Sequence, residues 1–297
     1  MEYKKTIPKI AVFLLVCLLA TFSYASETKG PTTKKIPPSF LLITVDTLSA
    51  YRLPFYGYKR NTAPFLGKLA EHGIVFNNAY SASSWTVPAV TSLVTGVYPS
   101  SHGIMRGSVK NGHIYKQAPV PKKLPNLPEQ LKALGYRTYA VTANYHLTKE
   151  LGFGRGFDRY ACVGFCAAEK VNSFFLKWKR EIESQKGPVF IWLHYFDPHI
   201  PYIGRQPWLK QYQNDETEEE SGMVSSLLRP VQMRQTIKNK GQRILTLAKS
   251  HYDSEINYCD EQINKLFQEF PSLEQYVMVF TADHGEEFME HGRLGHA

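Results

Sequence analysis

Three apolar segments of this sequence end in residues that are able to bind metal ions. The residues at these ends are Asp46, then His194 and His199, then Asp283 and His284. Carboxylate oxygens and imidazole nitrogens are ordinary ligands for zinc, and manganese or magnesium becomes suitable as the share of oxygen rises. A single acidic residue after a strand is more often a helix cap, so the expectation of a divalent-metal site rests on all three ends together.

A fourth stretch, residues 84–96 (SWTVPAVTSLVTG), supplies a hydroxyl that can act as a nucleophile. Pro88 is typical of the first turn of a helix, which places Thr86 at or just before the helix N-terminus. Backbone N–H groups and the helix dipole favour an anion there. A metal bound to the same hydroxyl lowers its pKa, so we expect Thr86 to attack a phosphate or sulfate ester. The simpler interpretation is that Thr86 only caps the helix.

Alternating strand and helix patterns predict the scaffold that positions these residues. Strands are expected at residues 40–45, 136–142, 188–194 and 276–281, and helices at 63–71, 128–134, 170–183 and 252–267. The continuous apolar run 40–45 is typical of a strand buried on both faces of a parallel sheet. The alternation indicates an α/β fold, a doubly wound, mostly parallel sheet with helices on both faces. Ligands bind beyond the carboxyl ends of such strands, where the polar clusters lie.

Several stretches together resemble the sulfatase branch of the alkaline phosphatase superfamily, in the family's order from residue 40 to the chain end. They are 42–48 (LITVDTL), 85–88 (WTVP), 93–103 (LVTGVYPSSHG), 194–199 (HYFDPH), 252–263 (YDSEINYCDEQI) and 283–292 (DHGEEFMEHG). The resemblance implies an alkaline-phosphatase-like fold. It implies that Asp46, Asp283 and His284 are metal ligands, and that Thr86 is both the fourth ligand and the nucleophile.

The resemblance also suggests roles for the remaining histidines. His199 matches a histidine that contacts the ester or its leaving group. His296, twelve residues after His284, resembles a histidine beside the metal ligands of phosphoethanolamine transferases, and His291 is a rival for that substrate-binding role. His194 is expected to be a structural neighbour of His199.

Two departures from the sulfatase pattern redirect the expected chemistry. Authentic sulfatases carry Cys or Ser at the position of Thr86, for oxidation to formylglycine, with an Arg where this chain has Val90. They also commonly pair two Asp at the first strand end, where Thr47 follows Asp46 here. A threonine nucleophile resembles lipoteichoic acid synthases and phosphoethanolamine transferases instead.

The expected function is therefore that of a metal-dependent hydrolase or transferase acting on phosphate or sulfate esters. The cofactor is one divalent ion, with Zn, Mn, Mg and Ca not distinguished. The alternatives are a sulfuric ester hydrolase that works without formylglycine, and an inactive anion-binding remnant. The remnant is considered because the family's core continues past the last histidine cluster, whereas this sequence stops at Ala297, as a truncated domain would.

The N-terminus predicts export. Residues 1–25 combine a basic start, an apolar run and a small–x–small end, which indicates a signal peptide and a periplasmic or secreted protein. An uncleaved membrane anchor is the alternative. Residues 26–38 are a flexible lead-in, and 39–297 form the catalytic domain. Within it, 205–246 is a polar insertion, either a solvated segment or a mobile cover over the site.

Composition and charge limit the partners. With 297 residues, 43% of them hydrophobic and 21% charged, the chain is able to bury a core. The formal net charge of +9 favours anionic partners, such as lipid head groups, glycans or polymers bearing an ester, and allows association with a membrane surface. No zinc finger, basic helix or basic stripe with interleaved aromatic residues indicates nucleic-acid binding. Cys162 and Cys166 are close enough in sequence to pair, and Cys259 is expected in the core.

Overall fold

A computed structural model of the chain describes residues 36–105, 108–110, 113–116, 118–213, 215, 217–227 and 230–296. The predicted signal peptide, 1–25, and most of the lead-in, 26–38, lie outside the described residues. The chain from Pro38 onward forms one compact unit.

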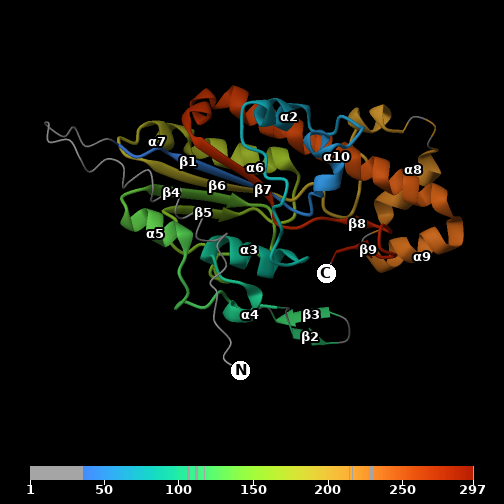
Figure 1. Ribbon diagram of the computed structural model, residues 1–297, viewed down its shortest axis with the longest axis horizontal. Helices are drawn as coiled ribbons and strands as arrows, with labels where there is room; N and C mark the ends of the chain where they lie inside the picture. The colour runs from blue at the N-terminus through green and yellow to red at the C-terminus, as the bar shows by residue number, and fades with distance from the viewer. Residues whose placement is uncertain are drawn as a thin grey trace, which may run out of the picture. The chain divides into compact units, whose positions relative to one another are not determined.

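A five-stranded parallel sheet lies at the centre of this unit, in the order β5-β4-β6-β1-β7 (Figure 1). Its strands are β1 (Phe40–Val45), β4 (Arg137–Thr142), β5 (Arg159–Cys162), β6 (Val189–Tyr195) and β7 (Val277–Ala282). Two small antiparallel pairs complete the described strands, β2 (Ser108–Lys110) with β3 (His113–Lys116), and β8 (Glu287–Phe288) with β9 (Leu294–Gly295).

Helices cover both faces of the sheet (Figure 1). On one face lie α2 (Pro64–Glu71), α6 (Ala168–Phe175), α7 (Lys179–Glu183) and α10 (Gln242–Glu269). On the other lie α3 (Thr86–Thr95), α4 (Pro99–His102) and α5 (Leu127–Ala133). The helices α8 (Glu218–Ser226) and α9 (Pro230–Lys240) pack on α10. Short 3-10 turns are η1 (Ala50–Arg52), η2 (Pro54–Tyr56), η3 (Leu176–Trp178), η4 (Trp208–Gln211) and η5 (Pro271–Gln275).

Alternate side chains of β1 enter different cores. Leu41, Ile43 and Val45 belong to the core under α2, α6 and α10. Leu42 points the other way, into the core that Val90 of α3 and Leu131 of α5 help to form. Because both faces are covered, an unbroken apolar run is the sequence that this strand requires. The predicted α/β fold is confirmed.

The predicted strands agree with the structure to within two residues at each end, but the sheet has a further strand, β5. It is only four residues long and lies at one edge, which is too short for a periodic pattern to indicate it. At the other edge, β7 leaves Val277 and Val279 exposed, so it is less buried than its apolar sequence suggested.

Three other segments differ from the sequence-based expectation. The helix predicted over 170–183 consists of α6, η3 and α7 in succession. The helix predicted over 252–267 is part of the much longer α10. The polar insertion 205–246 is largely helical, and its apolar side chains Leu209 and Val224 are buried. Its polar sequence reflects the exposed faces of these helices.

The three cysteines among the described residues carry free thiols. Cys162 and Cys166 are not joined, and Cys259 is buried in α10 as expected. Among the described residues, no helix combines the length and apolar character needed to cross a membrane.

Candidate metal centre

The loop after β1 is held in an unusual backbone conformation. Asp46 is fully buried, and Thr47 has a φ of 57°, in the left-handed region that β-branched residues avoid. The Thr47 N–H donates to Asp283 Oδ1 at 3.1 Å. The Tyr252 hydroxyl of α10 donates to the Thr47 carbonyl at 2.6 Å and accepts from the Ser49 N–H at 2.9 Å. These contacts hold the strained turn in place and fix the position of Asp46.

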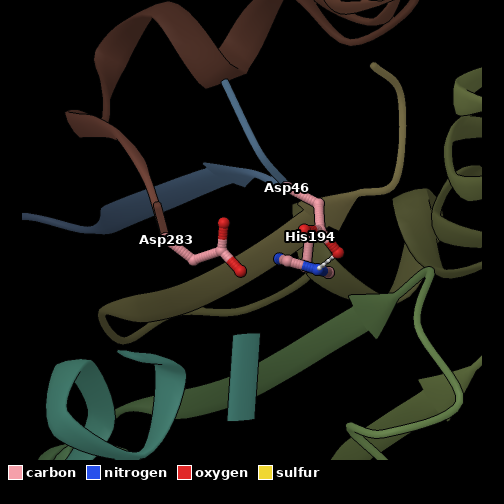
Figure 2. Close-up of side chains that lie close together, drawn as sticks. All are labelled: Asp46, His194 and Asp283. Atoms are coloured by element: carbon pink, nitrogen blue, oxygen red, sulfur yellow. Dashed lines mark ion pairs between the residues drawn. The ribbon is translucent and has the colours of Figure 1, made fainter. Parts of the chain in front are cut away.

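Asp46, His194 and Asp283 come together at the carboxyl ends of three neighbouring strands (Figure 2). One potential ligand atom from each lies within 4.8 Å of the other two, and all three side chains are buried. Figure 2 shows the Asp283 carboxylate pointing toward the other two residues. His194 Nε2 is 3.6 Å from Asp46 Oδ2, and its Nδ1 forms a hydrogen bond of 2.8 Å with Thr44 Oγ1. His194, expected only as a neighbour of His199, is thus part of this cluster.

Thr86 and His284 complete the same cluster. Thr86 is the first residue of α3, and its Oγ1 is 3.3 Å from Asp46 Oδ1 and 3.2 Å from His284 Nε2. His284 Nε2 is 3.6 Å from Asp46 Oδ1 and 3.5 Å from Asp283 Oδ2. A tetrahedral zinc site with bonds of about 2.0–2.2 Å has ligand atoms about 3.3–3.6 Å apart. The four separations between these atoms lie in or close to this range, so these pairs of atoms are compatible with ligands of one small divalent ion.

Hydrogen bonding directs the His284 lone pair into the site. Its Nδ1 lies 3.0 Å from the Gly285 carbonyl, which can only accept, so Nδ1 carries the proton. Neutral imidazole then presents a bare Nε2 to Thr86 and the carboxylates, as a metal ligand must.

The charges of the cluster also suit a cation. Burial opposes the charge on Asp46, but His194, His199 and His284 together hold its pKa below the usual value. Burial and then the Asp46 charge raise the pKa of Asp283 to about 8. Asp283 Oδ2 is buried and has no hydrogen-bond partner. Two buried carboxylates, one of which has an oxygen without a hydrogen-bond partner, suit a divalent ion. Such an ion would displace the proton that Asp283 otherwise keeps.

A row of histidine rings extends outward from the cluster. The ring centroids of His284 and His296 are 4.7 Å apart, and those of His296 and His199 are 4.9 Å apart. His296 Nδ1 lies 3.0 Å from Glu286 Oε1. Burial lowers the pKa of His199, whereas Glu286 outweighs burial at His296 and raises its pKa. His291 is not brought to this row, because its side chain is 81% exposed and pairs with Glu287.

One contributor to the site was missed from the sequence. Asn144, just beyond the end of β4, is buried and donates through Nδ2 to Asp46 Oδ2 at 2.8 Å. Its Oδ1 accepts from the His146 N–H at 2.9 Å. Asn144 follows a predicted strand, as Asp46 and Asp283 do, and this position could have indicated a role in the site. Asparagine is common after strands, however, so the position alone did not distinguish it.

Comparisons with known proteins identify the family of the chain. The Sulfatase family model matches residues 38–297. N-acetylgalactosamine-6-sulfatase of Rattus norvegicus is 29% identical over 131 residues, which cover 42% of this chain but only 25% of that protein. The matched region thus spans about a quarter of this relative's length.

Two solved structures share the fold. Phosphonate monoester hydrolase of Agrobacterium radiobacter superposes with a TM-score of 0.64 at 17% identity, covering 87% of this chain and 65% of that one. The zinc complex of the C-terminal periplasmic domain of EcEptC from Escherichia coli gives a TM-score of 0.59 at 20% identity, covering 89% and 69%. Because the Sulfatase family model matches residues 38–297, the chain belongs to the sulfatase family.

Proposed function

We propose that the chain is a metal-dependent hydrolase or transferase of phosphate or sulfate esters, with Thr86 as its nucleophile. The observation that carries this proposal is the position of Thr86 Oγ1, 3.3 Å from Asp46 Oδ1 and 3.2 Å from His284 Nε2 at the start of α3. A threonine that only capped a helix would need neither the buried carboxylate nor the bare imidazole nitrogen beside it.

One divalent ion would be held by Asp46, Thr86, Asp283 and His284. His194 lies at the edge of the same cluster. Support comes from the spacing of their ligand atoms and from the unpartnered Asp283 Oδ2. The structurally similar EcEptC domain was solved as a zinc complex, which makes zinc the first ion to test. Such an ion lowers the pKa of a bound hydroxyl and neutralises charge on the ester oxygens.

Different residues of the chain then carry out the separate steps of the reaction. The Thr86 hydroxyl releases its proton to solvent, its oxygen bonds to phosphorus, and the bond from phosphorus to the leaving alcohol's oxygen breaks. His199 delivers a proton to the departing alkoxide, and His296 beside it, whose pKa Glu286 raises, supplies the proton that His199 gives up. Thr86 carries the phosphoryl group until water, or the hydroxyl of an acceptor alcohol, takes it. Water makes the protein a hydrolase, and a sugar or lipid hydroxyl makes it a transferase.

Sulfate-ester hydrolysis is the second candidate, and it is favoured by the sulfatase names of the matched relatives. The same displacement at sulfur uses the same residues. It would proceed without formylglycine, because a threonine at position 86 cannot be oxidised to that aldehyde. Relative rates on matched aryl phosphate and aryl sulfate esters separate the two candidates.

The nucleophile is tested by Thr86→Ala and Thr86→Ser. With the metal-loaded protein and an aryl phosphodiester or aryl sulfate, we expect Thr86→Ala to lose turnover by at least about 10³-fold, since covalent catalysis is removed. Thr86→Ser keeps a hydroxyl and is expected to retain measurable activity. Undiminished turnover in Thr86→Ala would remove the nucleophile assignment.

Export and an anionic partner belong to the same proposal. The N-terminal sequence predicts a signal peptide, and the similar EcEptC domain is periplasmic. A positively charged chain outside the cytoplasm suits an ester on a lipid head group, glycan or polymer. Detection of the mature N-terminus at residue 26 in an exported fraction would test this assignment.

A further inference from the structure

The loop that carries His199 is closed at its base by one arginine. This loop follows β6, and we call its residues 196–205 the His199 loop. Arg205 donates through Nη2 to Asp197 Oδ1 at 2.7 Å, so the two ends of the loop are joined directly by a contact that we call the clamp. The Asp197 side chain is buried, and a hydrogen bond between two charged groups is among the stronger kinds. The backbone between the two ends, which includes His199, therefore has few positions open to it.

Further contacts hold the closed end of the His199 loop on α10. Arg205 Nε donates to Glu255 Oε2 at 3.1 Å, and the Arg205 N–H donates to Ser254 Oγ at 2.9 Å. Glu255 also accepts the Ile203 N–H, through Oε1 at 3.1 Å. The guanidinium carbon of Arg205 lies 4.3 Å from the centroid of the Tyr258 ring. Arginine suits this position because its planar group donates in two directions at once, to the loop and to the helix.

The His199 ring is held mainly by its own loop. Its Nδ1 lies 2.6 Å from the Ile200 carbonyl, and its ring stacks on Phe196 with centroids 4.4 Å apart. Because a carbonyl can only accept, Nδ1 carries a proton and Nε2 is the atom left to exchange one with a leaving group. Ile200 and Phe196 both belong to the His199 loop. The place of the ring beside His296 thus depends on where this loop is anchored.

Resting on the proposed function, we infer that Asp197 and Arg205 are positioning residues for His199, whose ring their clamp holds within reach of the leaving oxygen. Neither residue is assigned a contact with the ester. A proton donor must lie within hydrogen-bond distance of the atom that it protonates, and a displacement of about 1 Å can cost about 10²-fold in rate. Opening the clamp therefore impairs proton delivery and leaves the metal ligands and Thr86 in place.

The charges of the clamp show which variant opens it with least damage to the fold. Burial raises the pKa of both Asp197 and Glu255, and the Arg205 cation opposes this rise at each. Asp197→Ala removes one of the two acids and leaves Glu255 paired with Arg205. Replacing Arg205 would instead leave both buried acids without their cation, which is strongly destabilising. Asp197→Ala is therefore the variant that tests positioning.

Two phosphodiesters that differ in their leaving group test the inference on the metal-loaded protein. Diethyl phosphate releases ethoxide, which needs a proton, whereas ethyl p-nitrophenyl phosphate releases p-nitrophenolate, which does not. We expect Asp197→Ala to lower kcat on diethyl phosphate by about 10²-fold and kcat on the nitrophenyl ester by at most about threefold. Asp197→Asn keeps an oxygen that can accept from Arg205 and should recover the diethyl phosphate rate to within about fivefold of the wild type.

A control variant and a measurement without turnover accompany the rates. Asp260→Ala also removes a buried acid of α10, but one that accepts N–H groups at the start of α2. It should leave the ratio of the two rates unchanged even where it lowers stability. The backbone amides of His199, Ile203 and Arg205 should exchange with deuterium about tenfold faster in Asp197→Ala than in the wild type, because local opening of the loop becomes easier.

Several outcomes would overturn the inference. They are equal losses on both esters in Asp197→Ala, full activity of that variant on diethyl phosphate, and unchanged exchange in the His199 loop. A wild type that turns over the nitrophenyl ester but not diethyl phosphate overturns it too, because there is then no proton delivery for the clamp to support. The proposed function fails on a different result, undiminished turnover in Thr86→Ala.

Discussion

The hydroxyl of Thr86 lies 3.2 Å from Nε2 of His284, although 198 positions separate the two residues in the chain. Thr86 opens α3 on one face of the sheet, and His284 follows β7 at the sheet's edge. Their meeting point also receives the Asp46 carboxylate from the end of β1.

Metal binding is expected to depend on Asp283 and His284. Purified wild-type protein should carry about one divalent ion, measured by mass spectrometry of the metal, and saturating ion at 100 times its Kd should stabilise the fold by about 2.7 kcal/mol. Asp283→Ala and His284→Ala should lose both effects. The control is Asp215→Ala, whose side chain is 69% exposed. One ion per chain with no turnover on any ester would favour the anion-binding remnant instead.

Replacing His199 should affect esters according to their leaving group. His199→Gln removes the proposed proton donor, so turnover of an alkyl phosphodiester should fall by about 10²–10⁴-fold. A p-nitrophenyl ester, whose leaving group needs no proton, should slow far less. His291→Gln is the matched control, because that ring is exposed and outside the histidine row. Equal losses on both esters would contradict the assignment.

Asn144 should act through Asp46 rather than on the substrate. Asn144→Ala deletes the 2.8 Å hydrogen bond to Asp46 Oδ2, and loss of such a support typically costs about 10–100-fold in metal affinity or activity. Asn126→Ala is the control, since Asn126 is equally buried but lies directly before α5. Metal affinity measured by competition with a chelating dye distinguishes the two. An unchanged affinity in Asn144→Ala would show that Asp46 needs no such support.

Arg205 is expected to matter for stability because it neutralises two buried acids. It donates to Asp197 Oδ1 at 2.7 Å and to Glu255 Oε2 at 3.1 Å. Arg205→Met leaves both without their cation and should lower the free energy of unfolding by about 3–5 kcal/mol, measured in denaturant. Arg243→Met removes an exposed arginine bonded to Glu220 and should have little effect. Comparable losses in both variants would refute the distinction.

Asp260 should make stability depend on pH. It accepts the Phe65 and Leu66 N–H groups at 2.8 Å each and so caps α2 from α10, because Ala63 at the cap position has no side chain to do so. Burial raises the pKa of Asp260 from 3.8 to about 6, even though these N–H groups lower it.

A carboxyl with a raised pKa in the folded state stabilises the fold below its unfolded pKa, and this contribution is lost as the pH rises through the folded pKa. Between pH 4 and 7 the wild type should therefore lose up to about 3 kcal/mol relative to Asp260→Asn. Urea unfolding of both proteins across this range measures the difference. Parallel profiles would show that Asp260 does not titrate in this window.

The sequence alone determined the elements and the chemistry at their ends. The apolar run 40–45 favoured a strand covered on both faces, and a polar residue that follows such a strand is expected at the ligand-binding edge of the sheet. Pro88 similarly indicated that Thr86 opens a helix, which the structure confirms. These are local properties, because backbone preference and burial pattern act within a few residues.

Contacts between distant segments were decided by the tertiary structure. Val45 is in register with Ala282 of β7 and with Tyr195 of β6, so Asp46 lies beside Asp283 and near His194. The pairing of β4 with β6 then brings Asn144 to the same carboxylate. His296 and His291 were indistinguishable as residue types, yet one ring packs on His199 while the other is exposed. Strand register and loop packing depend on the summed contacts of the whole fold, which no local pattern encodes.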